Sequence, residues 1–110
     1  MKQGEIWELY LDPIKGSEQG GRRTVVIISG NLLNEHLKIV IVCPLTTKVK
    51  NYKGNVILEP STENGLLAIS EILVFHVRSV TKERLKEKIG TITAKQLTEI
   101  KQTLDDILRY

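Results

Sequence analysis

Two neighbouring arginines and a distant threonine are the side chains whose chemistry points to a bound anion. Arg22 and Arg23 end the stretch GSEQGGRR, which begins at Gly16, and they lead directly into the apolar run TVVIIS. Thr46 follows 23 residues after Arg23, in the stretch CPLTTKVK. A guanidinium group is always charged and its planar fork matches two phosphate oxygens, while a threonine hydroxyl adds a neutral hydrogen bond. The pattern predicts an anion-binding site at the mouth of a rigid scaffold.

Several familiar catalytic signatures are absent from the 110 residues. The sequence contains no HExxH, no GxxxxGK[ST] phosphate loop and no GxSxG nucleophile elbow. Its two histidines lie 40 residues apart, so we expect neither a metal site nor a cofactor. The single cysteine, Cys43, lies in an apolar run and is expected to be a buried, inert thiol.

Composition and charge narrow the class of protein further. The net charge is +3 and the isoelectric point is near 9.1, which is compatible with nucleic acid but does not establish it. No run of about 18 apolar residues is present, so we expect no membrane span, no signal peptide and a cytoplasmic protein.

Chemistry that needs only charge and hydrogen bonds fits this inventory. RNA carries its own nucleophile, the 2′-OH beside each phosphate, so an enzyme need only align it, stabilise the phosphorane and move two protons. That route needs no metal and yields a 2′,3′-cyclic phosphate and a 5′-OH. Taken singly, the residues have ordinary structural explanations. Arg22 and Arg23 could pair with Glu18, and Thr46 could bind a local backbone amide.

The hydrophobic pattern predicts five or six short strands followed by one long helix. Strands are expected at Glu5–Leu11, at Thr24–Ser29, at Leu37–Cys43 with Pro44 ending it, at Asn55–Glu59, and once or twice within Leu66–Val80. Short helices are expected at Asn31–His36 and Thr81–Glu87, and a brief extended segment at Ile89–Ile92. Because strand follows strand without long helices between them, we expect one α+β, mostly β domain over residues 1–110. Its sheet would form a small antiparallel barrel with the helix packed against it.

The long helix has a clear start and an apolar face. Thr93 and Gln96 have the spacing of a capping box. The apolar residues that follow keep to one helical face, and we expect this face to pack on the core: Leu97, Ile100, Leu104, Ile107 and Leu108.

Nearly the whole chain resembles the MazF/PemK family of toxin endoribonucleases. The opening QGEIWELYLDPIKGSEQGGRR resembles the family's first strand and substrate-gating loop, and TVVIIS resembles its second strand. CPLTT resembles the end of its active-site strand, and SEILVFHVRSVTKERL a later strand that lines the RNA groove. The resemblance implies an SH3-like barrel with a C-terminal helix, in agreement with the predicted pattern of strands.

The resemblance also implies roles for individual residues. Arg23 and Thr46 fall where the family has its catalytic arginine and its catalytic threonine or serine. The remaining positions that would contact RNA are Ser17, Glu18, Gln19, Thr47, Lys48, His76 and Arg78. The implied partners are single-stranded RNA, a second copy of the chain, and a cognate antitoxin whose acidic, disordered tail occupies the RNA groove.

Two positions depart from the family pattern. Thr24 stands where a proline commonly follows the catalytic arginine, a change that a strand tolerates. His76 replaces the usual glutamine of a Gln-Ile-Arg stretch, and strand alternation would place it on one face with Arg78. Histidine suits proton transfer near pH 7 far better than arginine, so His76 is a candidate for RNA binding or proton transfer. An ordinary, partly buried histidine is the alternative.

Two other functions fit the same fold. One is a CcdB-like toxin that poisons DNA gyrase through its C-terminal helix, and the other is a catalytically inactive RNA-binding module. The stretch GSEQGGRR together with Thr46 favours the nuclease. Aromatic residues make up 5% of the chain, and Trp7 shares a face with Leu9, so we expect base stacking to be a minor part of RNA binding.

Overall fold

The computed structural model of the protein describes residues 1–10 and 22–110. In this part of the chain the strands are β1 (Glu5–Tyr10), β2 (Arg22–Ile27), β3 (Ile39–Thr46), β4 (Val56–Leu58), β5 (Ser70–Ile72), β6 (Arg78–Thr81) and β7 (Leu85–Thr91). The α-helices are α1 (Asn31–His36) and α2 (Ala94–Arg109), and two 3-10 helices are η1 (Val74–His76) and η2 (Lys82–Arg84). Each strand predicted from the pattern of apolar residues is present, with its ends shifted by a few residues.

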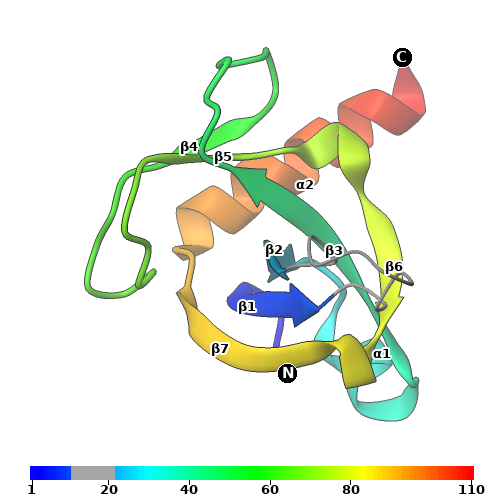
Figure 1. The fold of residues 1–110 in the computed structure, drawn as a ribbon. Coiled ribbons are helices and arrows are strands. Elements are labelled where there is room, and N and C mark those ends of the chain that lie inside the picture. Colours follow the sequence, from blue (N-terminus) through cyan, green and yellow to red (C-terminus); the bar gives the residue numbers. More distant parts are fainter. Residues whose placement is uncertain (11–21) are drawn as a thin grey trace, which may run out of the picture.

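The strands form one curled antiparallel sheet with the order β4-β5-β3-β2-β1-β7. Strand β3 is the longest strand and holds the sheet together, because it pairs with β2 on one side and with both β6 and β5 on the other. Figure 1 shows β7 curving around β1, while α2 lies across the sheet. This mostly β, half-barrel sheet with a C-terminal helix confirms the predicted fold class.

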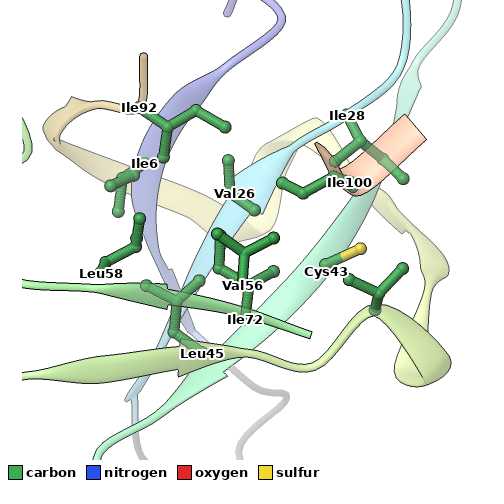
Figure 2. Close-up of a cluster of buried hydrophobic side chains, with 11 residues drawn as sticks. Ile6, Val26, Ile28, Cys43, Leu45, Val56, Leu58, Ile72, Ile92 and Ile100 are labelled. Atoms are coloured by element: carbon green, nitrogen blue, oxygen red, sulfur yellow. The ribbon is translucent and has the colours of Figure 1, made fainter. Parts of the chain in front are cut away.

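Two apolar clusters lie on opposite faces of the sheet. The face toward α2 carries Ile6, Val26 and Cys43, and the fully buried Ile100 joins them from the helix (Figure 2). The other face carries a second cluster of buried residues: Leu9, Val25, Ile27, Val40, Val42, Val80 and Leu85. Because successive side chains of a strand point to opposite faces, β2 contributes Val25 to one cluster and Val26 to the other.

Strand β3 runs through Pro44, so the prediction that Pro44 ends the strand was wrong. Val25 is the register partner of Pro44, and the strand continues to Thr46. The Pro44 carbonyl accepts a hydrogen bond from the Leu73 N–H at 2.8 Å. Leu73 lies between the two strands that share this edge of β3. The missing proline N–H therefore falls where the neighbouring strand is interrupted, and its cost to the sheet is small.

Two segments differ from their predicted structure. Val74–His76 is the 3-10 helix η1 and separates β5 from β6, so strand alternation does not relate His76 to Arg78. The helix predicted over Thr81–Glu87 is a single 3-10 turn, η2, and β7 begins directly after it at Leu85. In both cases a short turn lets the chain change partners around the curved sheet.

Helix α2 begins as predicted and leaves the core at its end. Thr93 accepts a hydrogen bond from the Gln96 N–H, and the Gln96 side chain accepts one from the Thr93 N–H. Ile100 is buried, but Ile107 is 40% exposed and Leu108 is 86% exposed. The prediction that the whole apolar face packs on the core was therefore wrong for the last turn.

Candidate functional site

A cavity of about 430 Å³ opens on the sheet face opposite to α2. Its floor consists of apolar side chains from β1, β2 and β3, which belong to the second core cluster. Charged and polar groups surround this floor, so the pocket combines a rigid base with a cationic rim. The residues that line it are Leu9, Arg23, Val25, Val42, Pro44, Leu73, His76 and Arg78.

Arg23 and its neighbour Arg22 have different surroundings. Arg22 forms an ion pair with Glu8 at 3.0 Å and lies over the Tyr10 ring, 5.7 Å from its centroid. Arg23 lies opposite Leu9 in the β1–β2 ladder and lines the pocket. Within the described residues, no hydrogen bond or ion pair engages its guanidinium. Among the described residues, Arg22 is the arginine of the pair with an acidic partner, and Arg23 is the one that lines the pocket.

Arg78 and His76 bring further polar groups to the same pocket. Arg78 begins β6, opposite Val42, and His76 ends η1. Both side chains are exposed and both line the cavity with Arg23. The two residues line one cavity, and a turn rather than the predicted strand alternation brings them together. Two guanidinium groups and an imidazole around one cavity suit a phosphodiester.

Thr46 is the last residue of β3 and is half-buried. The β2–β3 ladder ends at the pair Val25 and Pro44. Arg23 and Thr46 each lie two residues beyond that pair, so the same register, if continued, would place them opposite each other. Alternation places both on the face that carries the pocket, although the pocket lining does not include Thr46. The Thr46 hydroxyl accepts a hydrogen bond from the Lys48 N–H at 3.1 Å. It keeps its own proton to donate, because accepting that bond uses a lone pair.

The other predicted contact residues fall into two groups. Thr47 and Lys48 follow β3 directly and are exposed. Ser17, Glu18 and Gln19 lie outside the described residues. Among the residues that are described, no three His, Cys, Asp or Glu side chains gather as metal ligands.

A buried carboxylate, missed by the sequence analysis, underlies the loop that follows Thr46. Glu71 is 0% exposed and lies opposite Thr46 in the β3–β5 ladder. Its oxygens accept hydrogen bonds from four donors, namely the backbone N–H groups of Lys50 (2.8 Å), Asn51 (2.9 Å) and Tyr52 (2.9 Å) and the side-chain amide of Asn55 (2.9 Å). Burial alone raises the pKa of Glu71, but these hydrogen bonds outweigh it and hold the pKa below its ordinary value of 4.5. A glutamate inside the apolar run ISEILV was the available signal.

Residues 2–108 match the family of PemK-like, MazF-like toxins of type II toxin–antitoxin systems. The chain belongs to this family. Among curated proteins, Endoribonuclease MazF of Staphylococcus saprophyticus is 36% identical over 107 residues, which cover 96% of this chain and 88% of that protein. Endoribonuclease MazF of Staphylococcus epidermidis is 33% identical over 106 residues, with the same coverage of both chains.

Solved structures agree with the family assignment. A MazE–MazF crystal structure from Deinococcus radiodurans is 29% identical and superposes with a TM-score of 0.83, covering 98% of this chain and 95% of that one. A structure of MazF alone from the same organism has a TM-score of 0.78 at 29% identity and covers 100% of this chain. The toxin therefore has the MazF fold along its length.

Cys43 takes no part in the chemistry of this toxin's pocket. Its side chain is fully buried in the cluster under α2, and burial raises the pKa of the thiol to about 12. The expectation of a buried thiol is thus confirmed. None of the helices in residues 1–10 and 22–110 is long and apolar enough to cross a membrane.

His76 offers a direct test of the departure from the family pattern. We expect His76→Gln to leave kcat for RNA cleavage unchanged from pH 5 to 8, because the glutamine amide still forms hydrogen bonds with RNA. KM is expected to change little, because both side chains can form hydrogen bonds with RNA. Steady-state cleavage of a labelled RNA at each pH measures both constants. A fall in kcat that follows the titration of a single group would instead identify His76 as a proton-transfer residue.

Proposed function

We propose that this toxin is an endoribonuclease that cleaves single-stranded mRNA at specific sequences without a metal ion. The observation that carries the proposal is the rim of one pocket, where Arg23, Arg78 and His76 surround an apolar floor. The names of the curated relatives, Endoribonuclease MazF, support the same activity. The products are an RNA fragment ending in a 2′,3′-cyclic phosphate and a second fragment with a 5′-OH.

In the proposed reaction the RNA supplies the nucleophile and the protein supplies charge and orientation. The 2′ oxygen attacks phosphorus and loses its proton, while the bond from phosphorus to the 5′ oxygen breaks and that oxygen gains a proton. Arg23 stabilises the negative charge that grows on the phosphoryl oxygens, and the Thr46 hydroxyl donates a hydrogen bond to the same group. Arg78, His76, Thr47 and Lys48 bind the neighbouring nucleotides, together with Ser17, Glu18 and Gln19 of the preceding loop.

One assay tests the reaction class. Purified toxin is incubated with a long single-stranded RNA in EDTA, and the new ends are mapped. Discrete cuts that end in a cyclic phosphate are expected. Intact RNA with a shifted electrophoretic complex would point to an inactive RNA-binding module.

A second candidate function rests on the end of α2. Leu108 and Tyr110 are almost fully exposed there, which suits contact with another protein such as the gyrase target of a CcdB-like toxin. Absence of any effect on RNA in the EDTA assay, combined with inhibition of gyrase supercoiling in a separate assay that contains Mg²⁺ and ATP, would favour this function. The position of Arg23 in the pocket lining favours the nuclease.

We infer that the toxin is a single domain that works in the cytoplasm as a homodimer and is inhibited by a cognate antitoxin. The cationic rim of the pocket complements the acidic, disordered tail expected of that partner. The solved MazE–MazF complex of a relative supports an antitoxin of this kind. Exposed apolar side chains around α1 and the start of β3, namely Leu33, Leu37 and Ile39, support contact with a second copy.

Thr46→Ala is expected to lower kcat by about 10²-fold, because one hydrogen bond to the transition state is lost. The fold should persist, since the lost hydrogen bond from the Lys48 N–H lies at the surface, where water replaces it. Thr46→Ser keeps the hydroxyl and is the matched control, with near-normal kcat expected. Single-turnover cleavage measures both variants. If Thr46→Ala cleaves as fast as Thr46→Ser, the hydroxyl has no role in the chemical step.

A further inference from the structure

A second cavity, of about 440 Å³, adjoins the Arg23 pocket. Leu73 and His76 line both cavities, so the two cavities are neighbours. The second cavity lies between the loop after β3 and the turn η1. Its lining residues are Tyr52, Lys53, Asn55, Leu73, Phe75 and His76.

Two aromatic side chains set the chemistry of the second cavity. Tyr52 comes from the loop after β3 and Phe75 from η1. Their side chains are exposed to a similar extent, 57% and 55%. An exposed aromatic ring offers its face to a nucleobase, and every base stacks because every base has a π-face. Lys53 adds a positive charge beside the rings, which suits the phosphate attached to a stacked base.

A hydrogen-bond relay that starts at Glu71 holds both walls of the second cavity in place. The Glu71 carboxylate accepts from the Tyr52 N–H and from the Asn55 side-chain amide. The side-chain oxygen of Asn55, Oδ1, in turn accepts from the Val74 N–H at 3.0 Å, at the start of η1. One wall carries Tyr52 and the other carries Phe75. The backbone segments that carry the two rings are therefore held together before any ligand arrives, which lowers the entropic cost of binding.

The relay also limits what the second cavity recognises. Both polar ends of the Asn55 side chain are engaged, one with Glu71 and one with Val74. Recognition of a base edge by Asn55 is thereby weakened, and the rings provide most of the contact. Binding here is expected to depend on the presence of a base more than on its identity.

We propose that the second cavity binds a nucleobase of the RNA, one that flanks the phosphate held by Arg23. Tyr52 and Phe75 are its stacking residues, and Glu71 and Asn55 are positioning residues. The proposal rests on the proposed RNA-cleaving function, and it gives stacking a larger part in RNA binding than the low aromatic content suggested. The earlier expectation considered Trp7, which packs against the second core cluster.

The test measures the affinity for a single-stranded RNA oligonucleotide with 2′-O-methyl groups, which cannot supply the nucleophile. Its sequence spans a cleavage site mapped with the natural RNA. Tyr52→Leu and Phe75→Leu keep apolar bulk but remove the aromatic face. Each is expected to raise Kd by about fivefold to a hundredfold, the scale of one lost stacking contact. Tyr110→Leu is the matched control, because Tyr110 is an exposed aromatic residue that lines neither cavity.

An abasic scan of the same oligonucleotide locates the base. Removing the base at one position beside the cleavage site should weaken binding to the wild-type toxin. The same abasic oligonucleotide should bind Phe75→Leu almost as well as the intact oligonucleotide does, since both changes remove the same contact. Unchanged Kd in both leucine variants would overturn the proposal. A change in dimer dissociation without a change in RNA affinity would also overturn it, because the rings would then contact protein.

Failure of this proposal can be told apart from failure of the proposed function. If the toxin cuts natural RNA in EDTA and the leucine variants bind the oligonucleotide normally, the proposed nuclease activity is supported and the proposed base-binding cavity is rejected. If the oligonucleotide binds through Tyr52 and Phe75 but natural RNA stays intact, the base-binding cavity is supported and the nuclease activity is rejected.

Discussion

Arg23→Ala is expected to lower kcat for RNA cleavage by about 10²- to 10³-fold, the scale of losing one preorganised contact to transition-state charge. The reason is geometric and electrostatic. Arg23 lines the pocket, and no partner among the described residues neutralises its guanidinium. Folding should be unaffected, because the side chain is exposed at the start of β2. Single-turnover cleavage and thermal unfolding of the same preparation measure the two properties.

Arg22→Ala is the matched control for this experiment. It removes the same charge from the adjacent residue, but Arg22 pairs with Glu8 and stacks over Tyr10 instead of lining the pocket. The expected change in kcat is small, since surface ion pairs contribute little. The kcat of Arg23→Lys should lie between those of Arg22→Ala and Arg23→Ala, because lysine keeps the charge and lacks the planar fork. Equal losses in Arg22→Ala and Arg23→Ala would show that the pocket responds only to net charge, and the role given to Arg23 would be wrong.

Local sequence signals predicted the elements that depend on local contacts. The alternation in EIWELY indicated β1, and the β-branched run after Arg23 indicated β2. The capping box of Thr93 and Gln96 fixed the start of α2. Each of these signals lies within a few consecutive residues, and in these three elements the distant contacts agree with it.

Features that depend on distant partners were not predictable in this way. Pro44 is tolerated in β3 only because η1 interrupts the adjacent strand, and η1 itself looked like part of one continuous strand. Leu108 continues an apolar helical face, yet the sheet ends before it. Periodicity records which residues could be buried, but the partner that buries them lies elsewhere in the chain.

The candidate site also has parts that local sequence signals predict and parts that depend on distant partners. Arg23 and Thr46 are singled out by residue type and spacing, and they lie at the ends of β2 and β3 just beyond the last register pair, Val25 with Pro44. The cavity formed by Tyr52 and Phe75 could not be singled out in this way, because the two residues are joined only through the hydrogen bonds of Glu71 and Asn55. No local pattern shows which donors a buried glutamate will find.

Glu71→Gln is expected to reduce the free energy of unfolding by about 2–4 kcal/mol at pH 7, since a buried acceptor of four hydrogen bonds loses its charge and half its acceptor sites. One carboxylate oxygen accepts from Lys50 and Asn51, and the other accepts from Tyr52 and Asn55. A glutamine keeps one oxygen, so its NH₂ group must face two donors. The loop from Lys50 to Asn55 should then detach from β5. Amide exchange at residues 50–52 should accelerate, while exchange in the β1–β2 ladder stays slow.

The pH dependence separates the charge of Glu71 from its shape. Because the folded-state pKa lies below 4.5, the ionised Glu71 stabilises the fold fully above that value. The contribution is lost as pH falls through the lowered pKa, so the stability gap between wild type and Glu71→Gln should narrow below pH 4.5. Glu59→Gln is the matched control, since it removes an exposed glutamate carboxylate just after β4 and should change stability by less than about 0.5 kcal/mol. Denaturant unfolding from pH 3 to 7 measures the free energy of unfolding of the wild type, Glu71→Gln and Glu59→Gln. A gap that stays constant over this range would mean that the Glu71 charge contributes nothing and that the side chain acts through packing alone.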